Sequence, residues 1–136
     1  DVHKIVQAGL SDFITIRHPD GTRFSAHESY EINKKSRELI NWNADVIITH
    51  HCPIDIKHPH FDSSDISYAF VNTGLEETIM DSNVKHWLYG HNHWSDSHDL
   101  NGTNVVSNQR GYVRNGDDEE SQWLKSNYNP SLLLHV

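Results

Sequence analysis

The sequence predicts an α/β fold in which helices alternate with short strands. Two apolar runs of strand length, 45–49 and 84–89, each follow a segment with helix-start signals. An Asn-Gly pair inside 96–107 separates two further short runs, which is typical of a β-hairpin with a tight turn. The expected order is therefore helix, strand, helix, strand, hairpin and a last strand.

Two segments carry the pattern of a helix N-terminal capping box. Residues 25–28 read Ser-Ala-His-Glu and predict a helix that runs to about Trp42. Residues 73–76 read Thr-Gly-Leu-Glu and predict a helix that runs to about Ser82. At helical spacing, one face of the first helix is expected to be buried: Ile32, Ser36, Leu39 and Ile40.

The run at 45–49 is continuously apolar and rich in β-branched residues, so we expect a strand buried on both faces. The other expected strands lie at 13–16, 84–89, 96–100, 103–107 and 131–135, with a polar excursion at 115–129.

Composition limits the classes of partner. The chain has 136 residues, a formal net charge of -8 and one cysteine. An acidic chain has no general attraction for a phosphate backbone, so bulk nucleic-acid binding is not expected. No apolar run reaches membrane-spanning length, and we expect a cytoplasmic protein that lacks a disulfide.

Histidine is the unusual component, with 12 residues in 136. His50 and His51 follow the first apolar strand directly, and His91 and His93 follow the second. Functional sites in open α/β sheets form beyond the carboxyl ends of the strands, and neutral imidazole is a common metal ligand. The sequence therefore predicts a metal site at this edge, and the alternate placement of His91 and His93 suits two neighbouring metal ions.

The segments 46–53 (Val-Ile-Ile-Thr-His-His-Cys-Pro) and 88–93 (Leu-Tyr-Gly-His-Asn-His) resemble the last two signature motifs of calcineurin-like metallophosphoesterases. Segments 11–13 and 104–112 and the helix after Ser25 are similar to a bacterial and phage branch of that family. That branch has Asn-Pro-Arg-Gly-Tyr after the His-x-His motif, whereas this chain has glutamine in the place of the proline. The resemblance covers most of 11–113 and implies the C-terminal portion of a layered metallophosphoesterase sandwich.

The resemblance implies roles for particular residues. His50 and His91 would ligate one metal ion and His93 the other, with His51 as the alternative to His50 or as a substrate-facing group. Apart from the resemblance, two interpretations of Arg110 stay open: its planar guanidinium pairs with substrate phosphate oxygens, or it forms a surface salt bridge. The complete site would hold two divalent ions, with manganese expected first and iron, zinc or nickel as alternatives. The implied reaction is hydrolysis of a small phosphorylated substrate by a metal-activated hydroxide, in a bacterial or phage-infected host cell.

Half of the family's pattern is missing. The Asp-x-His, Gly-Asp and Gly-Asn-His motifs, which supply the bridging carboxylate, are not found upstream of His50. Asp1-Val2-His3 and Gly116-Asp117 match two of them in letters only, and we attribute both to chance. We therefore expect residues 1–136 to form a single, incomplete domain that a complementing N-terminal half or oligomer partner would complete.

Two other functions stay open at this stage. The chain could be a catalytically inactive, metallophosphoesterase-like binding or regulatory module. It could also be a mononuclear zinc protein, because three histidines are enough for one zinc ion. Further expectations concern single residues. We expect Asp96 or Asp99 to orient a ligand histidine, and we expect Cys52 to be buried. We expect packing roles for Trp87, Trp94 and Trp123, a loop position for His58 and His60, and solvent exposure for Asp117–Glu120.

Overall fold

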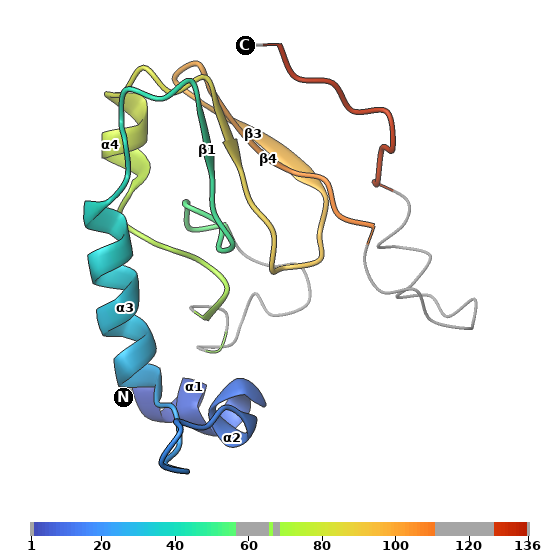
Figure 1. The fold of residues 1–136 in the computed structure, drawn as a ribbon. Helices are drawn as coiled ribbons and strands as arrows, with labels where there is room; N and C mark the ends of the chain where they lie inside the picture. Colours follow the sequence, from blue (N-terminus) through green and yellow to red (C-terminus); the bar gives the residue numbers. More distant parts are fainter. Residues whose placement is uncertain (1, 57–65, 67–68, 111–126, 136) are drawn as a thin grey trace. The chain divides into compact units, whose positions relative to one another are not determined.

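The computed structural model describes residues 2–56, 66, 69–110 and 127–135. They form a mixed α/β protein with a four-stranded sheet and helices (Figure 1). The chain divides into two compact units, residues 1–40 with 59–69 and residues 41–58 with 70–136. No helix among the described residues is long and apolar enough to cross a membrane.

The first unit contains helices α1 (Val2–Gly9), α2 (Asp12–Thr15) and α3 (Ala26–Glu38). Val6, Phe13 and Ala26 form its buried cluster, and Leu10, Phe24 and Ala69 pack against them. The predicted strand at 13–16 is wrong, because one helical turn places Phe13 in this core.

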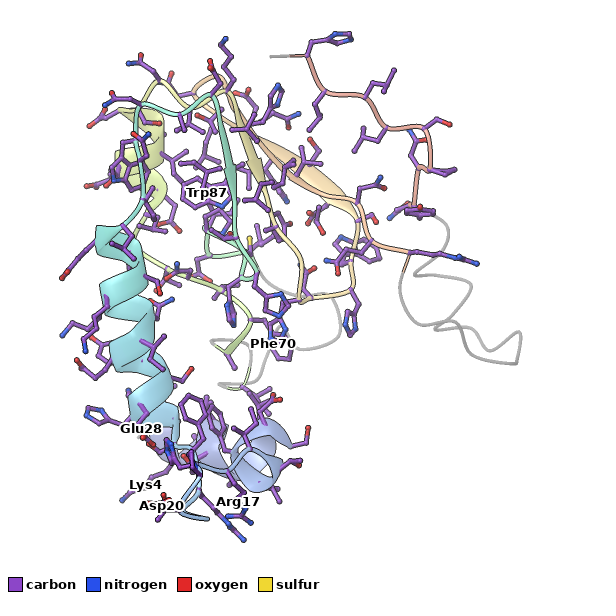
Figure 2. All side chains as sticks on the ribbon, in the orientation of Figure 1. Lys4, Arg17, Asp20, Glu28, Phe70 and Trp87 are labelled. Carbon is purple, nitrogen blue, oxygen red and sulfur yellow. The ribbon has the colours of Figure 1, made fainter. Side chains whose placement is uncertain are left out.

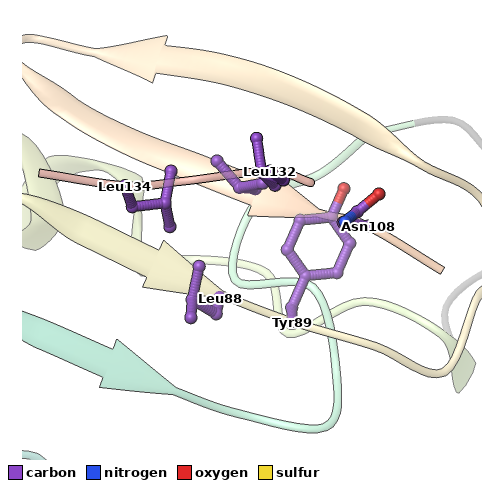
Figure 3. Close-up of a pocket in the computed structure, with 6 residues that line it drawn as sticks. Leu88, Tyr89, Asn108, Leu132 and Leu134 are labelled. Atoms are coloured by element: carbon purple, nitrogen blue, oxygen red, sulfur yellow. The ribbon is translucent and has the colours of Figure 1, made fainter. Parts of the chain in front are cut away.

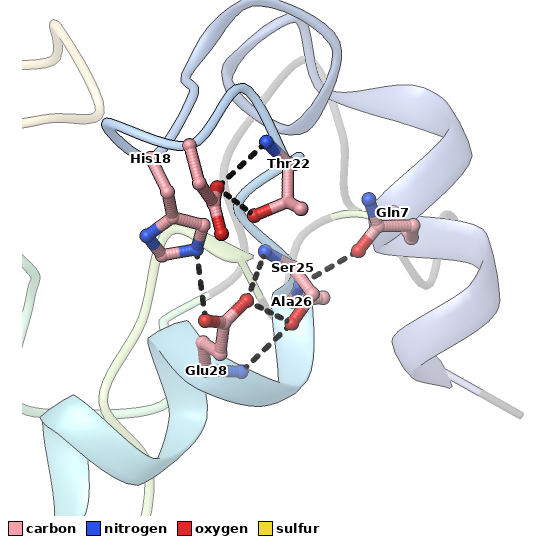
Figure 4. A network of polar contacts seen from close by, with 7 residues as sticks. Gln7, His18, Thr22, Ser25, Ala26 and Glu28 are labelled. Atoms are coloured by element: carbon pink, nitrogen blue, oxygen red, sulfur yellow. Dashed lines mark hydrogen bonds and ion pairs between the residues drawn. The ribbon is translucent and has the colours of Figure 1, made fainter.

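The predicted capping box at the start of α3 is confirmed. The Ser25 hydroxyl accepts a hydrogen bond from the Glu28 amide at 3.2 Å, and the Glu28 carboxylate accepts one from the Ser25 amide at 2.9 Å (Figure 4). His18 approaches the same carboxylate at 3.0 Å, and Gln7 accepts the Ala26 amide proton at 2.7 Å. The pKa of the Glu28 carboxyl is lowered from its usual value, and the hydrogen bond from the Ser25 side chain is the largest cause.

The rest of α3 departs from the prediction. The helix ends at Glu38 and not near Trp42, and a turn follows in which the Asn41 side chain accepts the Asn43 amide proton. The predicted apolar face is also wrong in part, since Ile32 and Leu39 are 55% and 84% exposed.

The second unit is built on a sheet of β1 (Val46–Ile48), β2 (His86–Leu88), β3 (Asp96–Leu100) and β4 (Thr103–Ser107). The strand order is β1-β2-β4-β3. β1 is parallel to β2 and β2 to β4, whereas β3 and β4 are antiparallel. Helix α4 (Glu76–Met80) lies in the same unit and contacts β3.

One face of the sheet forms the core of this unit. Trp87 is fully buried (Figure 2), and its register partners Ile47 and Val105 are buried beside it on β1 and β4. The indole N–H of Trp87 donates to the Thr49 hydroxyl at 2.9 Å. The prediction that Trp87 is a packing residue is therefore confirmed.

The strand predicted at 45–49 exists, but it is not buried on both faces. β1 lies at an edge of the described sheet, and Ile48 is 73% exposed. A continuous apolar run predicts a buried strand, but it does not show whether that strand lies at the centre or at the edge of the sheet.

The Asn101-Gly102 hairpin is confirmed with the predicted strand boundaries. Both turn residues have positive φ, 52° for Asn101 and 97° for Gly102, as a two-residue type I′ turn requires. The helix predicted after residue 73 is confirmed as α4, but its capping box is not. The Glu76 carboxylate instead accepts the amide protons of Gly74 and Asp55.

The strand predicted at 131–135 is wrong, because these residues form no strand. The segment lies over the sheet, where Leu132 and Leu134 line a cavity of about 300 Å³ together with Leu88 and Val106 (Figure 3). The carbonyl of His135 lies 2.7 Å from the His86 imidazole.

Candidate functional site

The histidine motifs meet at one edge of the sheet because β1 and β2 are parallel neighbours. Their backbones stay paired beyond the strands: the Thr49 amide donates to the Leu88 carbonyl at 2.9 Å, and the Gly90 amide donates to the His50 carbonyl at 3.1 Å. This pairing brings the loops that follow the two strands together. The predicted convergence of His50 and His91 is therefore confirmed.

Three imidazoles form a cluster at this edge. The His91 ring centroid lies 4.6 Å from that of His50 and 4.7 Å from that of His51, and the His50 and His51 centroids are 5.3 Å apart. The Phe70 ring stacks on His91 with a centroid separation of 4.8 Å. His50 and His51 thus have equivalent access to His91, and the choice between them as a ligand stays open.

These separations can be compared with those of imidazoles on a common ion. With a metal–nitrogen distance of about 2.1 Å, two imidazoles on one ion have ring centroids about 4.6 Å apart at a 90° ligand angle and about 5.3 Å apart at a tetrahedral angle. As the side chains are placed, however, residues 2–56, 66, 69–110 and 127–135 include no group of three or more His, Cys, Asp or Glu that could hold a metal ion. The ring centroids are therefore spaced as they would be on a common ion, although the described side chains do not form such a group.

The backbone of the second motif is unusual. His91 has φ of 66° and His93 has φ of 56°, in the left-handed region that non-glycine residues rarely adopt. Gly90, which precedes both histidines, has no positive φ. A Cβ added at Gly90 would make only ordinary contacts, at 3.7 Å to the His50 carbonyl oxygen.

The electrostatics of the cluster favour neutral imidazole. Burial and, after it, the neighbouring His51, His50 and His93 together lower the pKa of His91 to about 4. Neutral imidazole is the form that binds metal ions.

The core anchors the first motif. The Thr49 hydroxyl accepts the indole proton of Trp87 and donates to the His51 carbonyl at 2.7 Å. Cys52 is fully buried, as predicted, and burial raises the pKa of its thiol to about 12. At neutral pH Cys52 is a packing residue rather than a nucleophile.

The carboxylates expected to orient the ligands have other partners. Asp96 accepts a hydrogen bond from the buried Tyr89 hydroxyl and pairs with His98 at 3.1 Å. Asp99 accepts the Gly102 amide proton in the hairpin turn at 3.3 Å. The expectation that Asp96 or Asp99 orients a ligand histidine is therefore wrong, because both carboxylates form hydrogen bonds within the hairpin and at the strand ends.

The remaining predicted residues add little to the cluster. Arg110 is exposed. His3, part of the motif-like letters at the start of the chain, lies in helix α1, which agrees with a chance match. The positions of His58, His60, Trp123, Gly116 and Asp117–Glu120 lie outside the described residues.

Three residues of the site have no clear signal in the sequence. Phe70 stacks on His91, Asn92 is 8% exposed, and the Gln109 amide nitrogen donates to the Asn92 Oδ1 at 2.8 Å. In the sequence, Asn92 stands between the two histidines of the motif, and Gln109 stands where the resembled branch has proline, whereas nothing points to Phe70.

Comparison with known proteins identifies a similar viral protein. The chain is 23% identical over 148 aligned residues to the uncharacterized protein L509 of Acanthamoeba polyphaga mimivirus. The alignment covers 96% of this chain and 49% of the viral protein, so the chain spans about half of that relative's length. No family model matches the chain. No solved structure matches it either.

Proposed function

We propose that this chain supplies the histidine ligands of a calcineurin-like metallophosphoesterase that hydrolyses a small phosphate ester. The observation that carries the proposal is the meeting of His50, His51 and His91 at the carboxyl edge of two parallel strands, with ring centroids 4.6 to 5.3 Å apart. The fold proposed for the complete protein is the layered sandwich of that family, of which the four-stranded sheet would be part.

In the proposed site the chain would supply one share of the ligands. His50 and His91 would hold one divalent ion and His93 the other, with His51 as the alternative to His50. When bound, the ions would activate a water molecule and neutralise the phosphate oxygens. The described part of the cluster contributes imidazole nitrogen but no bridging carboxylate, because Asp96 is paired with Tyr89 and His98. A complementing segment or partner would supply that carboxylate.

The roles of the chain's own groups follow from their positions. The buried Trp87 and the Thr49 hydroxyl fix the loop that carries His50 and His51. Phe70 covers one face of His91 and excludes water from that side. Burial keeps His91 neutral and able to bind a metal ion over the physiological pH range. Arg110 would pair with phosphate oxygens.

The test is hydrolysis of a generic aryl phosphate with added Mn²⁺, for the chain alone and with a complementing chain that carries the three missing motifs. We expect activity that is lost in His91→Ala and in His93→Ala. His27→Ala is the matched control, because His27 is an exposed histidine of the other unit.

The other outcomes point to different functions. Uptake of about one zinc ion per chain without turnover would indicate a mononuclear zinc protein. Neither metal uptake nor turnover, with the complementing chain present, would contradict the proposal and leave an inactive binding or regulatory module.

A further inference from the structure

Each histidine of the second motif lies at the centre of its own short hydrogen-bonded turn. The Asn92 amide donates to the Gly90 carbonyl at 2.8 Å across His91. A bond between residues two apart, with positive φ between them, is typical of the classic γ-turn, which is rare and strained. The Trp94 amide donates to the Asn92 Oδ1 at 3.2 Å across His93. Asn92 therefore takes part in both turns.

Gln109 holds Asn92 from the end of β4. Its side-chain amide donates to the Asn92 Oδ1 and to the Ser107 hydroxyl, each at 2.8 Å. Its backbone amide donates to the Ser95 hydroxyl at 2.7 Å, and that hydroxyl donates back to the Gln109 carbonyl at 3.0 Å. Asn92, Ser95 and Ser107 are all buried, so loss of one member leaves polar groups without solvent to replace it.

A proline at position 109 could make neither set of bonds. It has no backbone amide proton for Ser95 and no side-chain donor for Asn92. Strained backbone persists only where the surrounding structure imposes it, and it is concentrated at functional sites. In this chain, the amide of Gln109 reaches the strained loop from beyond the end of β4.

We propose that Gln109 is a positioning residue that holds His91 and His93 in their left-handed conformation through Asn92, and thereby sets the affinity of the site for divalent metal ions. The effect on affinity rests on the proposed function, whereas the effect on the loop backbone does not. Removing an outer partner of a metal ligand typically weakens metal binding by about 10- to 100-fold.

The first test measures Mn²⁺ binding to the chain by calorimetry. Gln109→Met keeps the size of the side chain but removes the amide, and we expect affinity to fall by about 10- to 100-fold. Asn108→Ala is the matched control, since its side chain bonds to Asn129 and not to the loop. In an Asn92→Ala background, Gln109→Met should cause little further loss, because both changes break the same contact.

The second test reads the backbone without metal. Three-bond HN–Hα couplings and Cα shifts should change at His91 and His93 in Gln109→Met, but not at Asn101, which has φ of 52° in the hairpin turn. Unchanged couplings at both histidines would overturn the proposal. If the unaltered chain bound no Mn²⁺, the proposed function would fail while this measurement still decided the role of Gln109. Altered couplings with wild-type Mn²⁺ affinity would overturn the link to metal binding.

Discussion

Two turns of the sheet use the same rare backbone conformation for different reasons. The hairpin turn lies at the amino end of β4 and has φ of 52° at Asn101. The loop after the carboxyl end of β2 has φ of 66° at His91 and 56° at His93. A two-residue hairpin requires positive φ, and asparagine tolerates it. The longer loop after β2 is not a two-residue hairpin, and its residues of positive φ are two of the candidate ligands. Strained backbone is concentrated at functional sites, so positive φ at His91 and His93 supports a site in this loop.

The largest expected difference between the turns is in metal affinity. His50→Ala should weaken Mn²⁺ binding by about 100-fold or more, beyond the loss expected for an outer partner. His51→Ala should cost less than about 10-fold, and Asn101→Ala should have no effect. Calorimetric titration of the three variants measures this. A larger loss in His51→Ala than in His50→Ala would exchange their roles, and equal affinity in all three would contradict the site.

The two turns should also respond differently when a glycine is replaced. Gly102→Ala should lower the free energy of unfolding by about 1–2 kcal/mol, because alanine is strained at φ of 97° even though nothing lies within 4 Å of the added Cβ. Gly90→Ala should change it by less than about 0.5 kcal/mol, since φ is not positive there and the contacts are ordinary. Urea denaturation of both variants provides the comparison. A greater loss in Gly90→Ala than in Gly102→Ala would contradict this difference between the two turns.

Comparing the variants His93→Gly and His93→Ala measures the backbone strain at this position. Both substitutions remove the imidazole, so their difference reports the conformation alone. In the metal-free protein, His93→Gly should be more stable than His93→Ala by about 1 kcal/mol, the reverse of the usual order. The same reversal is expected for Asn101→Gly against Asn101→Ala, which serves as the reference. If His93→Ala were more stable than His93→Gly while the order at position 101 stayed reversed, the loop would not be held in the left-handed region.

The smallest expected effect is the pH dependence of stability. His91 has its pKa lowered from 6.5 to about 4, so the unfolded chain binds the proton more tightly than the folded protein. The stability of the metal-free protein should be complete above pH 6.5 and fall as the pH decreases from 6.5 towards 4. Because His91 is only partly buried, the loss from this group should be on the order of 0.5–1 kcal/mol. Urea titrations across this range should show a smaller loss in His91→Gln.

The hairpin and the first capping box could be predicted from the sequence because their interactions are local. The Asn101-Gly102 pair determines its turn, and Ser25 and Glu28 are three residues apart. The meeting of His50 and His91 could also be predicted, because it follows from the direction of two parallel strands.

The errors arise where distant residues decide the structure. The helical turn at Phe13 depends on packing against Val6 and Ala26. The exposure of Ile48 depends on the position of β1 in the strand order. The contact between Gln109 and Asn92 joins residues 17 positions apart, and no local pattern reveals it.

The most direct test of the metal site is to locate bound Mn²⁺ by its paramagnetic broadening of backbone amide signals. Mn²⁺ added in small steps to the ¹⁵N-labelled chain should first broaden the signals of residues 50, 51 and 90–93. The Asn101-Gly102 turn, at the other end of the sheet, should respond later. Broadening that begins at the acidic run Asp117–Glu120, or that favours no region, would contradict a metal site at the histidine cluster.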